Sequence, residues 1–175
     1  MKKILAVAVV GIAVFVWFRS GIGRDAEWTA LMKTIRTKYP DVRQLSTGEL
    51  AARINSGDEL TLLDARTRDE YAVSRISDAA HVLPDATEFP MLDSLSRETP
   101  IVVYCSVGYR SSEIASRLVA AGFTNVSNLE GSIFKWANEG RPLVSDPSGD
   151  PSVVHPFNAV WGRYLDKPRR FEAKQ

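Results

Sequence analysis

Apolar and polar residues alternate along the middle of the chain so that strands and helices are predicted in turn. Short segments predict strands at residues 42–45, 60–64, 80–83, 101–104 and 126–129, and the segment at 101–104 is wholly apolar and rich in β-branched residues. Apolar residues at helical spacing predict helices at residues 46–54, 89–95, 113–120 and 132–138. Repeated strand–helix alternation indicates an α/β fold, with a central parallel sheet of about five strands and helices on both faces.

The first residues have a different pattern. Lys2 and Lys3 precede fifteen uncharged residues, 4–18, and Arg19 follows them. At about 1.5 Å per residue the run spans roughly 22 Å, so it needs residues 19–22 to approach the roughly 30 Å of a bilayer core. We expect residues 1–23 to form a single-pass transmembrane anchor or a signal segment. Because bulky residues surround the weak cleavage site at 21–23, the anchor is preferred. It would place the domain on the extracytoplasmic side of a membrane.

Two further segments flank the predicted domain at residues 42–144. Residues 24–41 form an amphipathic connecting helix, with Trp28, Leu31, Met32 and Ile35 on one face. Residues 145–175 begin with a Pro-rich linker and continue into a C-terminal helix. The apolar positions of that helix are Phe157, Val160, Trp161, Tyr164 and Leu165. Packing of this helix against the domain is preferred over binding to a partner.

Composition excludes several kinds of function. A net charge of +1 over 175 residues argues against nucleic acid as a partner. Cys105 is the only cysteine, so there is no intrachain disulfide. With only His81 and His155 beside it, no metal-ligand set is present, and neither a metal nor a cofactor is expected.

The candidate chemistry lies directly after the apolar run at 101–104. The seven residues there are Cys105, Ser106, Val107, Gly108, Tyr109, Arg110 and Ser111. A loop that curls from a strand into a helix directs its amides inward and forms an anion-binding nest. The same amides, the helix dipole and the charge of Arg110 favour a thiolate, with Cys105 as nucleophile and the other six residues as substrate-binding. A buried structural cysteine is the plainer interpretation, but it leaves the coincidence of strand, cysteine, glycine and arginine unexplained.

This loop resembles the active-site loop of the rhodanese (sulfurtransferase) family, which often reads C-x-x-G-x-R-S after an apolar strand. Residues 62–66 with 70–71, and residues 128–143, are similar to two further family segments, so that the resemblance covers residues 42–144. It departs from the family at 74–79, which lacks the usual glycines, proline and histidine, and at Ser132, which replaces a glycine. The resemblance implies a three-layer rhodanese-like fold and a membrane-anchored sulfurtransferase. Sulfane sulfur would pass through a Cys105 persulfide from thiosulfate or a persulfide to cyanide, a small thiol or a protein acceptor.

Asp64 and Arg66 are predicted to support the loop. The resemblance implies that Asp64 orders neighbouring loops, which we prefer to a catalytic base because a preformed thiolate needs none. Arg66 and Glu70 have the spacing of a helical ion pair. Two other functions stay open: a cysteine-loop phosphatase or arsenate reductase of the same fold, and a non-catalytic membrane-tethered binding module. The phosphatase loop resembles C-x5-R, whereas four residues separate Cys105 from Arg110.

Overall fold

The computed structural model describes residues 22–172 of the chain. The predicted anchor at residues 1–23 lies almost entirely outside this range. Within residues 22–172, no helix has both the length and the apolar character needed to cross a bilayer.

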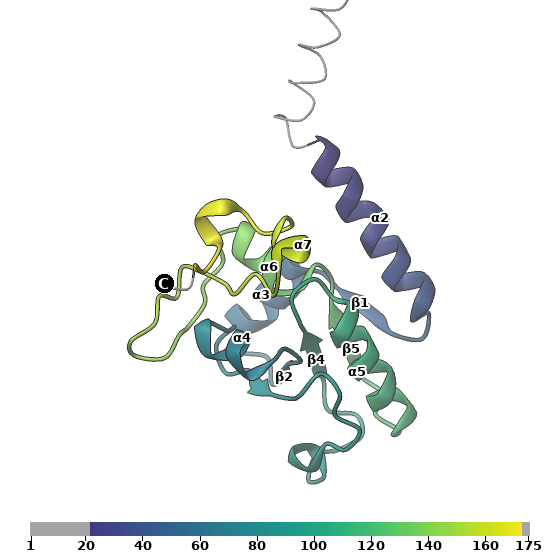
Figure 1. Ribbon diagram of the computed structural model, residues 1–175. Coiled ribbons are helices and arrows are strands. Elements are labelled where there is room, and N and C mark those ends of the chain that lie inside the picture. The colour runs from purple at the N-terminus through teal and green to yellow at the C-terminus, as the bar shows by residue number, and fades with distance from the viewer. Residues whose placement is uncertain (1–21, 173–175) are drawn as a thin grey trace, which may run out of the picture.

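Five parallel strands form one sheet, in the order β1-β5-β4-β2-β3 (Figure 1). They are β1 (Arg43–Leu45), β2 (Thr61–Asp64), β3 (Ala80–His81), β4 (Ile101–Tyr104) and β5 (Val126–Leu129). The predicted α/β fold with a parallel sheet is therefore confirmed. β4 is the central strand, and its last residue, Tyr104, lies level with Asp64 of β2. Cys105 consequently leaves the middle of the sheet at its carboxyl edge, where open α/β sheets bind ligands.

Two helices of the sheet domain begin where the sequence supplies side-chain caps. Four helices belong to this domain: α3 (Thr47–Ser56), α4 (Arg68–Val73), α5 (Tyr109–Ala120) and α6 (Ser132–Asn138). Ser46 with Glu49, and Thr67 with Glu70, form capping boxes at the starts of α3 and α4. The helix expected at 89–95 is only the 3-10 turn η1 (Pro90–Leu92), and it begins at Pro90 because a proline disfavours helical backbone at the preceding residue, Phe89.

Side chains of the central strands alternate between two cores. Leu62, Val102 and Tyr104 join the core beneath α3 and α6. Leu63, Val103 and Cys105 join the core beneath α5. This alternation follows from the two-residue period of a strand, and it gives the sheet a helical layer on each face.

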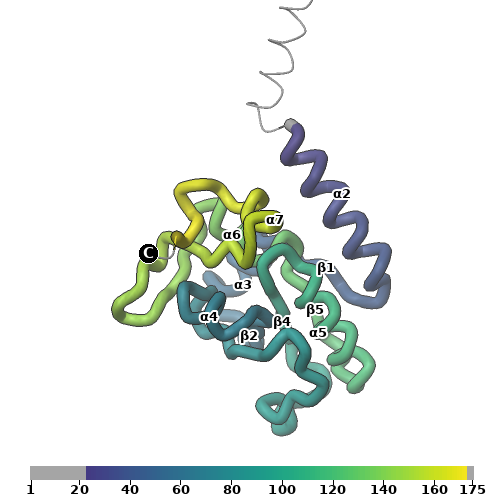
Figure 2. Tube along the Cα trace, in the orientation of Figure 1, coloured from purple at the N-terminus to yellow at the C-terminus, as the bar shows by residue number. Residues whose placement is uncertain are grey.

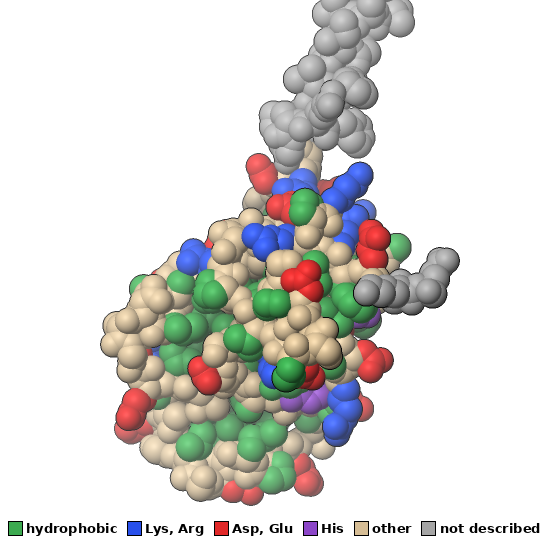
Figure 3. Space-filling model, turned by 90° about the vertical axis from the view of Figure 1, so that its left-hand side faces the viewer, with side chains coloured by type: hydrophobic (Ala, Val, Ile, Leu, Met, Phe, Trp, Pro, Cys, Tyr) green, Lys and Arg blue, Asp and Glu red, His purple; other side chains and the backbone are tan. Residues whose placement is uncertain are grey.

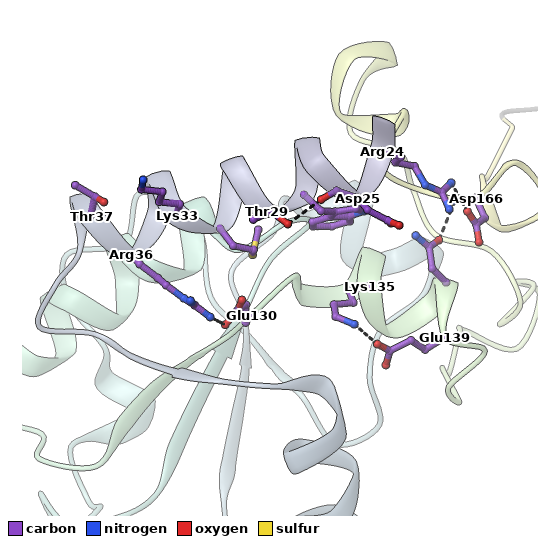
Figure 4. A pocket seen from close by; sticks show the side chains of 13 residues that line it. Arg24, Asp25, Thr29, Lys33, Arg36, Thr37, Glu130, Lys135, Glu139 and Asp166 are labelled. Atoms are coloured by element: carbon purple, nitrogen blue, oxygen red, sulfur yellow. Dashed lines mark hydrogen bonds and ion pairs between the residues drawn. The ribbon is translucent and has the colours of Figure 1, made fainter. Parts of the chain in front are cut away.

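The helix α2 (Ile22–Lys38) lies beside the sheet domain, and Figure 4 shows two of its attachments. Arg24 pairs with Asp166 at 2.5 Å, and Arg36 pairs with Glu130 at 2.5 Å. Ile35, on the predicted apolar face, is only 1% exposed. Basic side chains gather where the chain enters α2 (Figure 3).

The C-terminal segment packs back on the domain but forms less helix than its apolar spacing predicts. The helix α7 (Ala159–Gly162) is a single turn, and the 3-10 turn η2 (Lys167–Arg169) follows it. A longer helix is prevented at its start because Asn158, in extended backbone, caps α7. Tyr164 and Leu165 are buried, and the ring of Tyr164 meets the edge of Trp28 at 5.0 Å. Figure 2 shows this segment, in yellow, beside the turn between β4 and α5.

Candidate functional site

The cysteine loop is fixed at its start by the first turn of α6. The backbone amides of Ile133 and Phe134 donate to the carbonyls of Cys105 and Ser106, both at 3.1 Å. The Cys105 amide donates to the Ser132 hydroxyl at 3.1 Å. Ser132, which departs from the resemblance, therefore contributes an acceptor that a glycine could not. These hydrogen bonds fix the start of the cysteine loop against the first turn of α6.

Gly108 closes the loop and begins α5. Its φ of 113° lies in the region that favours glycine, and a Cβ there would approach the Asn128 amide nitrogen to 3.3 Å. This conformation directs the Gly108 amide to the Cys105 sulfur, at 3.2 Å. Ser111, one turn further, donates its hydroxyl to Asn128 at 2.6 Å and ties the start of α5 to β5.

The environment of Cys105 favours a thiolate. The side chain is buried, which works to raise its pKa. The positive charge of Arg110 and hydrogen bonds from Ser111 and Gly108 outweigh that burial, so the pKa of Cys105 lies below its ordinary value. The nucleophile predicted from the sequence is thus placed where a thiolate is stabilised.

Arg110 is bound by the carboxylate of Glu70, for which the sequence spacing predicted Arg66 as the partner. Its two terminal nitrogens each donate to Glu70 at 2.8 Å, and one of them also donates to the Ser106 hydroxyl at 2.8 Å. Ser106 in turn donates to Glu70 at 2.7 Å. Although burial works to raise it, the pKa of Glu70 falls to about 2 because of Arg110, Ser106 and the Thr67 amide. Glu70 therefore carries a full negative charge that compensates Arg110.

The predicted helical pair between Arg66 and Glu70 is wrong. Thr67 caps α4, so Arg66 lies outside the helix and its side chain turns the other way. Arg66 instead donates to Asp64, at 2.6 Å for the closest pair, and to the Ser74 carbonyl at 2.6 Å. Arg66 and Asp64 are fully buried, and neither lines the cavity above Cys105.

The pair formed by Asp64 and Arg66 instead organises the segment that departs from the resemblance. Arg66 holds the carbonyl of Ser74, and the buried Tyr104 hydroxyl accepts the Ile76 amide at 3.1 Å. These two contacts fix the backbone of residues 74–76, in a segment that lacks a proline to restrict it.

A cavity of about 220 Å³ opens above Cys105. Five of the predicted loop residues line it: Cys105, Ser106, Val107, Tyr109 and Arg110. Its remaining walls are Phe157 and Trp161, from the C-terminal segment. Helical spacing was the only sequence signal at these two positions, and it indicated packing rather than contact with the loop.

A larger cavity, of about 830 Å³, lies between α2 and the sheet domain and shares no residue with the Cys105 cavity (Figure 4). Charged side chains of both signs border it, and Arg36 with Glu130 and Lys135 with Glu139 are already paired. No thiol or histidine lies among the described residues that line it. The nucleophilic chemistry therefore belongs to the smaller cavity.

Comparison with known protein families shows the family of the domain that carries this loop. A family model described as the rhodanese-like domain matches residues 46–139, which is more than half of the chain. The chain belongs to the rhodanese-like domain family. The matched range includes the whole cysteine loop, Glu70 and Asp64.

Several relatives of this chain carry functional names. It is 31% identical over 114 residues to a protein named sulfurtransferase from Allochromatium vinosum, covering 62% of this chain and 99% of that one. It is 35% identical over 83 residues to the thiosulfate sulfurtransferase GlpE of Actinobacillus pleuropneumoniae, covering 47% of this chain and 76% of that one. The solution structure of a rhodanese-like domain from Anabaena superposes with a TM-score of 0.54 at 27% identity, over 61% and 86% of the two chains. The family, its fold and a general sulfurtransferase relationship are thus established.

The two aromatic walls of the Cys105 cavity lie outside the matched rhodanese range. Phe157 and Trp161 follow residue 139, the last residue matched, by more than a dozen positions. Part of the cavity wall therefore comes from a segment beyond the family domain.

Proposed function

We propose that this protein is a sulfurtransferase that carries sulfane sulfur as a persulfide on Cys105. The contact between the Gly108 amide and the Cys105 sulfur carries the proposal, because it stabilises an anion on the attacking atom. The lowered pKa of Cys105 supplies the thiolate without a separate base.

The reaction consists of two balanced displacements. In the first, the Cys105 thiolate attacks the outer sulfur of thiosulfate or of an organic persulfide. The new sulfur–sulfur bond forms as the donor's own bond breaks, and sulfite or a thiolate leaves with the electron pair. In the second, cyanide or an acceptor thiolate attacks the outer sulfur of the Cys105 persulfide and restores the Cys105 thiolate. The loop amides stabilise negative charge on sulfur in both states.

Intact-mass measurement tests this function directly. The wild-type protein, incubated with a donor and then desalted, is expected to gain the mass of one sulfur atom, and an acceptor should remove it. The Cys105→Ser variant keeps the side-chain volume similar and should gain nothing. An equal gain in both proteins, or none in the wild type with any donor, would overturn the assignment.

A phosphatase or arsenate reductase activity is less well supported. Four residues separate Cys105 from Arg110, and the Arg110 guanidinium is engaged by Glu70 rather than free to bind an oxyanion. Hydrolysis of p-nitrophenyl phosphate that is lost in Cys105→Ser would favour this alternative.

We also propose that residues 1–23 attach the domain to a membrane, with the domain on the extracytoplasmic side. The support is the sequence pattern: Lys2 and Lys3 before an uncharged run that ends in aromatic residues. Fractionation with intact-mass measurement tests it. A full-length protein in the membrane fraction is expected, whereas a shortened protein in the soluble fraction would indicate a cleaved signal.

A further inference from the structure

The cavity above Cys105 has one source of positive charge, and that charge is already compensated. Among the described residues that line the cavity, Arg110 is the only cation. Both of its terminal nitrogens donate to Glu70, whose pKa of about 2 keeps it ionised at any physiological pH. The pair is neutral overall, so a donor dianion entering beside the Cys105 thiolate is attracted less than it would be by an unpaired arginine.

The exposed face of Arg110 is also covered. The ring of Phe157 lies over the guanidinium, with its centroid 4.6 Å from the central carbon. Phe157 has a φ of 63°, which is rare for a bulky residue, within a tight turn closed by the Asn158 amide and the Pro156 carbonyl at 2.8 Å. The C-terminal segment thus maintains an unusual backbone conformation in the residue that covers Arg110.

The segment that carries this aromatic wall is fastened on both sides of it. Before the wall, the Ser74 hydroxyl donates to the Val153 carbonyl at 2.6 Å. After it, Asn138 of α6 donates to the Tyr164 carbonyl and accepts the Asp166 amide, both at 2.8 Å. Trp161 stacks on the buried Tyr164, with centroids 6.1 Å apart. Phe157 and Trp161 are therefore held in fixed positions as walls of the cavity.

We infer that this cavity selects sulfur donors with a neutral, apolar body, such as an alkyl or aryl persulfide, over thiosulfate. The inference rests on the proposed sulfur transfer and adds its substrate class. Phe157 and Trp161 are the specificity-determining residues: they contact the apolar part of the donor while its outer sulfur reaches Cys105. At roughly 30 Å³ per water molecule, about 220 Å³ holds some seven waters, which is enough for a small organic group.

The chemical step balances without a further reactant. The Cys105 thiolate attacks the outer sulfur of R–S–SH, and a bond forms between the two sulfur atoms. The bond from that sulfur to R–S breaks, and R–S⁻ leaves with the electron pair. The proton of the donor's outer sulfur stays on the new persulfide or passes to the leaving thiolate. No oxidant is consumed, because sulfane sulfur only changes its carrier.

Rates of sulfur loading on Cys105, followed by intact mass, test the inference with two probes: benzyl persulfide and thiosulfate. The wild type is expected to prefer benzyl persulfide in kcat/KM by at least about tenfold. Phe157→Ala and Trp161→Ala should each reduce that preference about tenfold or more, through loss of benzyl persulfide rate alone. Phe157→Lys should raise the thiosulfate rate, because it places an uncompensated cation at the cavity.

Val160→Ala is the matched control, since Val160 lies between the two wall residues, is 62% exposed and does not line the cavity. It should leave the preference unchanged. A wild type that prefers thiosulfate, or wall variants that slow both donors equally, would overturn the inference while the sulfur transfer stands. Failure of both donors to load Cys105 would overturn the proposed function and this inference together.

Discussion

Replacing Glu70 with glutamine removes the negative charge that binds Arg110 of the cysteine loop and leaves the size of the side chain nearly unchanged. The glutamine side chain keeps the reach of the capping box at the start of α4 and one acceptor for Arg110, but it carries no charge. Glu70 is buried, and its pKa falls from the ordinary 4.5 to about 2 in the folded protein. At 1.36 kcal/mol per pKa unit, this corresponds to roughly 3 kcal/mol of stability at neutral pH.

The lowered pKa of Glu70 determines how the loss of stability depends on pH. Because the pKa of Glu70 is lower in the folded state, its stabilisation is complete above about pH 4.5 and is lost as the pH falls toward 2. We expect Glu70→Gln to lower the free energy of unfolding by about 3 kcal/mol at pH 7 and by only about 1.5 kcal/mol at pH 3. Urea denaturation of both proteins at the two pH values, at constant ionic strength, measures this difference.

Glu49→Gln is the matched control, because Glu49 holds the same position in the capping box of α3 but forms no ion pair within residues 22–172. Its effect should be much smaller. The same variants test the electrostatics of the site: with Arg110 uncompensated, the pKa of Cys105 should fall further in Glu70→Gln, as seen in the pH profile of iodoacetamide alkylation. An equal loss of stability at both pH values, or a raised pKa of Cys105, would refute the reasoning.

Three other changes have definite expected outcomes. Arg110→Ala should raise the pKa of Cys105 and slow its alkylation at pH 7, because it removes the charge that most lowers that pKa; an unchanged profile would contradict this. Gly108→Ala should cost about 1–3 kcal/mol in denaturant unfolding because its φ is 113°, whereas the same substitution at the exposed Gly48, which has no such φ, should cost less. A chain that starts at Asp25 should stay soluble with its sulfur loading intact, because the ion pair that it loses, Arg24 with Asp166, is exposed. Loss of sulfur loading would show that the site depends on the N-terminal segment.

The sheet domain could be predicted because its signals are local. The central strand is a short β-branched run, and the cysteine loop directly follows it in sequence, so residues 101–111 describe both the strand and its loop. Predictions failed where spacing alone was used. Residues 89–95 and 157–165 have apolar residues at helical intervals, but they form only single turns, which begin at Pro90 and after the Asn158 cap.

The partners within the site could not be predicted because they come from distant parts of the chain. Glu70 lies at the start of α4, and its capping-box pattern indicated only a helix start. Spacing offered Arg66 as its partner, but the cap at Thr67 places Arg66 outside the helix, where the buried Asp64 binds it. The true partner, Arg110, is 40 residues further along and is brought near by the pairing of β2 with β4.

The same topology explains why the sheet domain alone does not complete its site. The carboxyl edge of a parallel sheet is where ligands bind, and segments outside the sheet can form the walls of a site there. Here Cys105 is only 1% exposed, and Phe157 and Trp161, beyond the matched rhodanese range, form the outer walls of its cavity. Trp161 stacks on Tyr164, and Tyr164 meets Trp28 of α2, so both segments that flank the domain contribute to one aromatic support. The family fold positions Cys105, whereas a flanking segment forms the outer walls of the cavity above it.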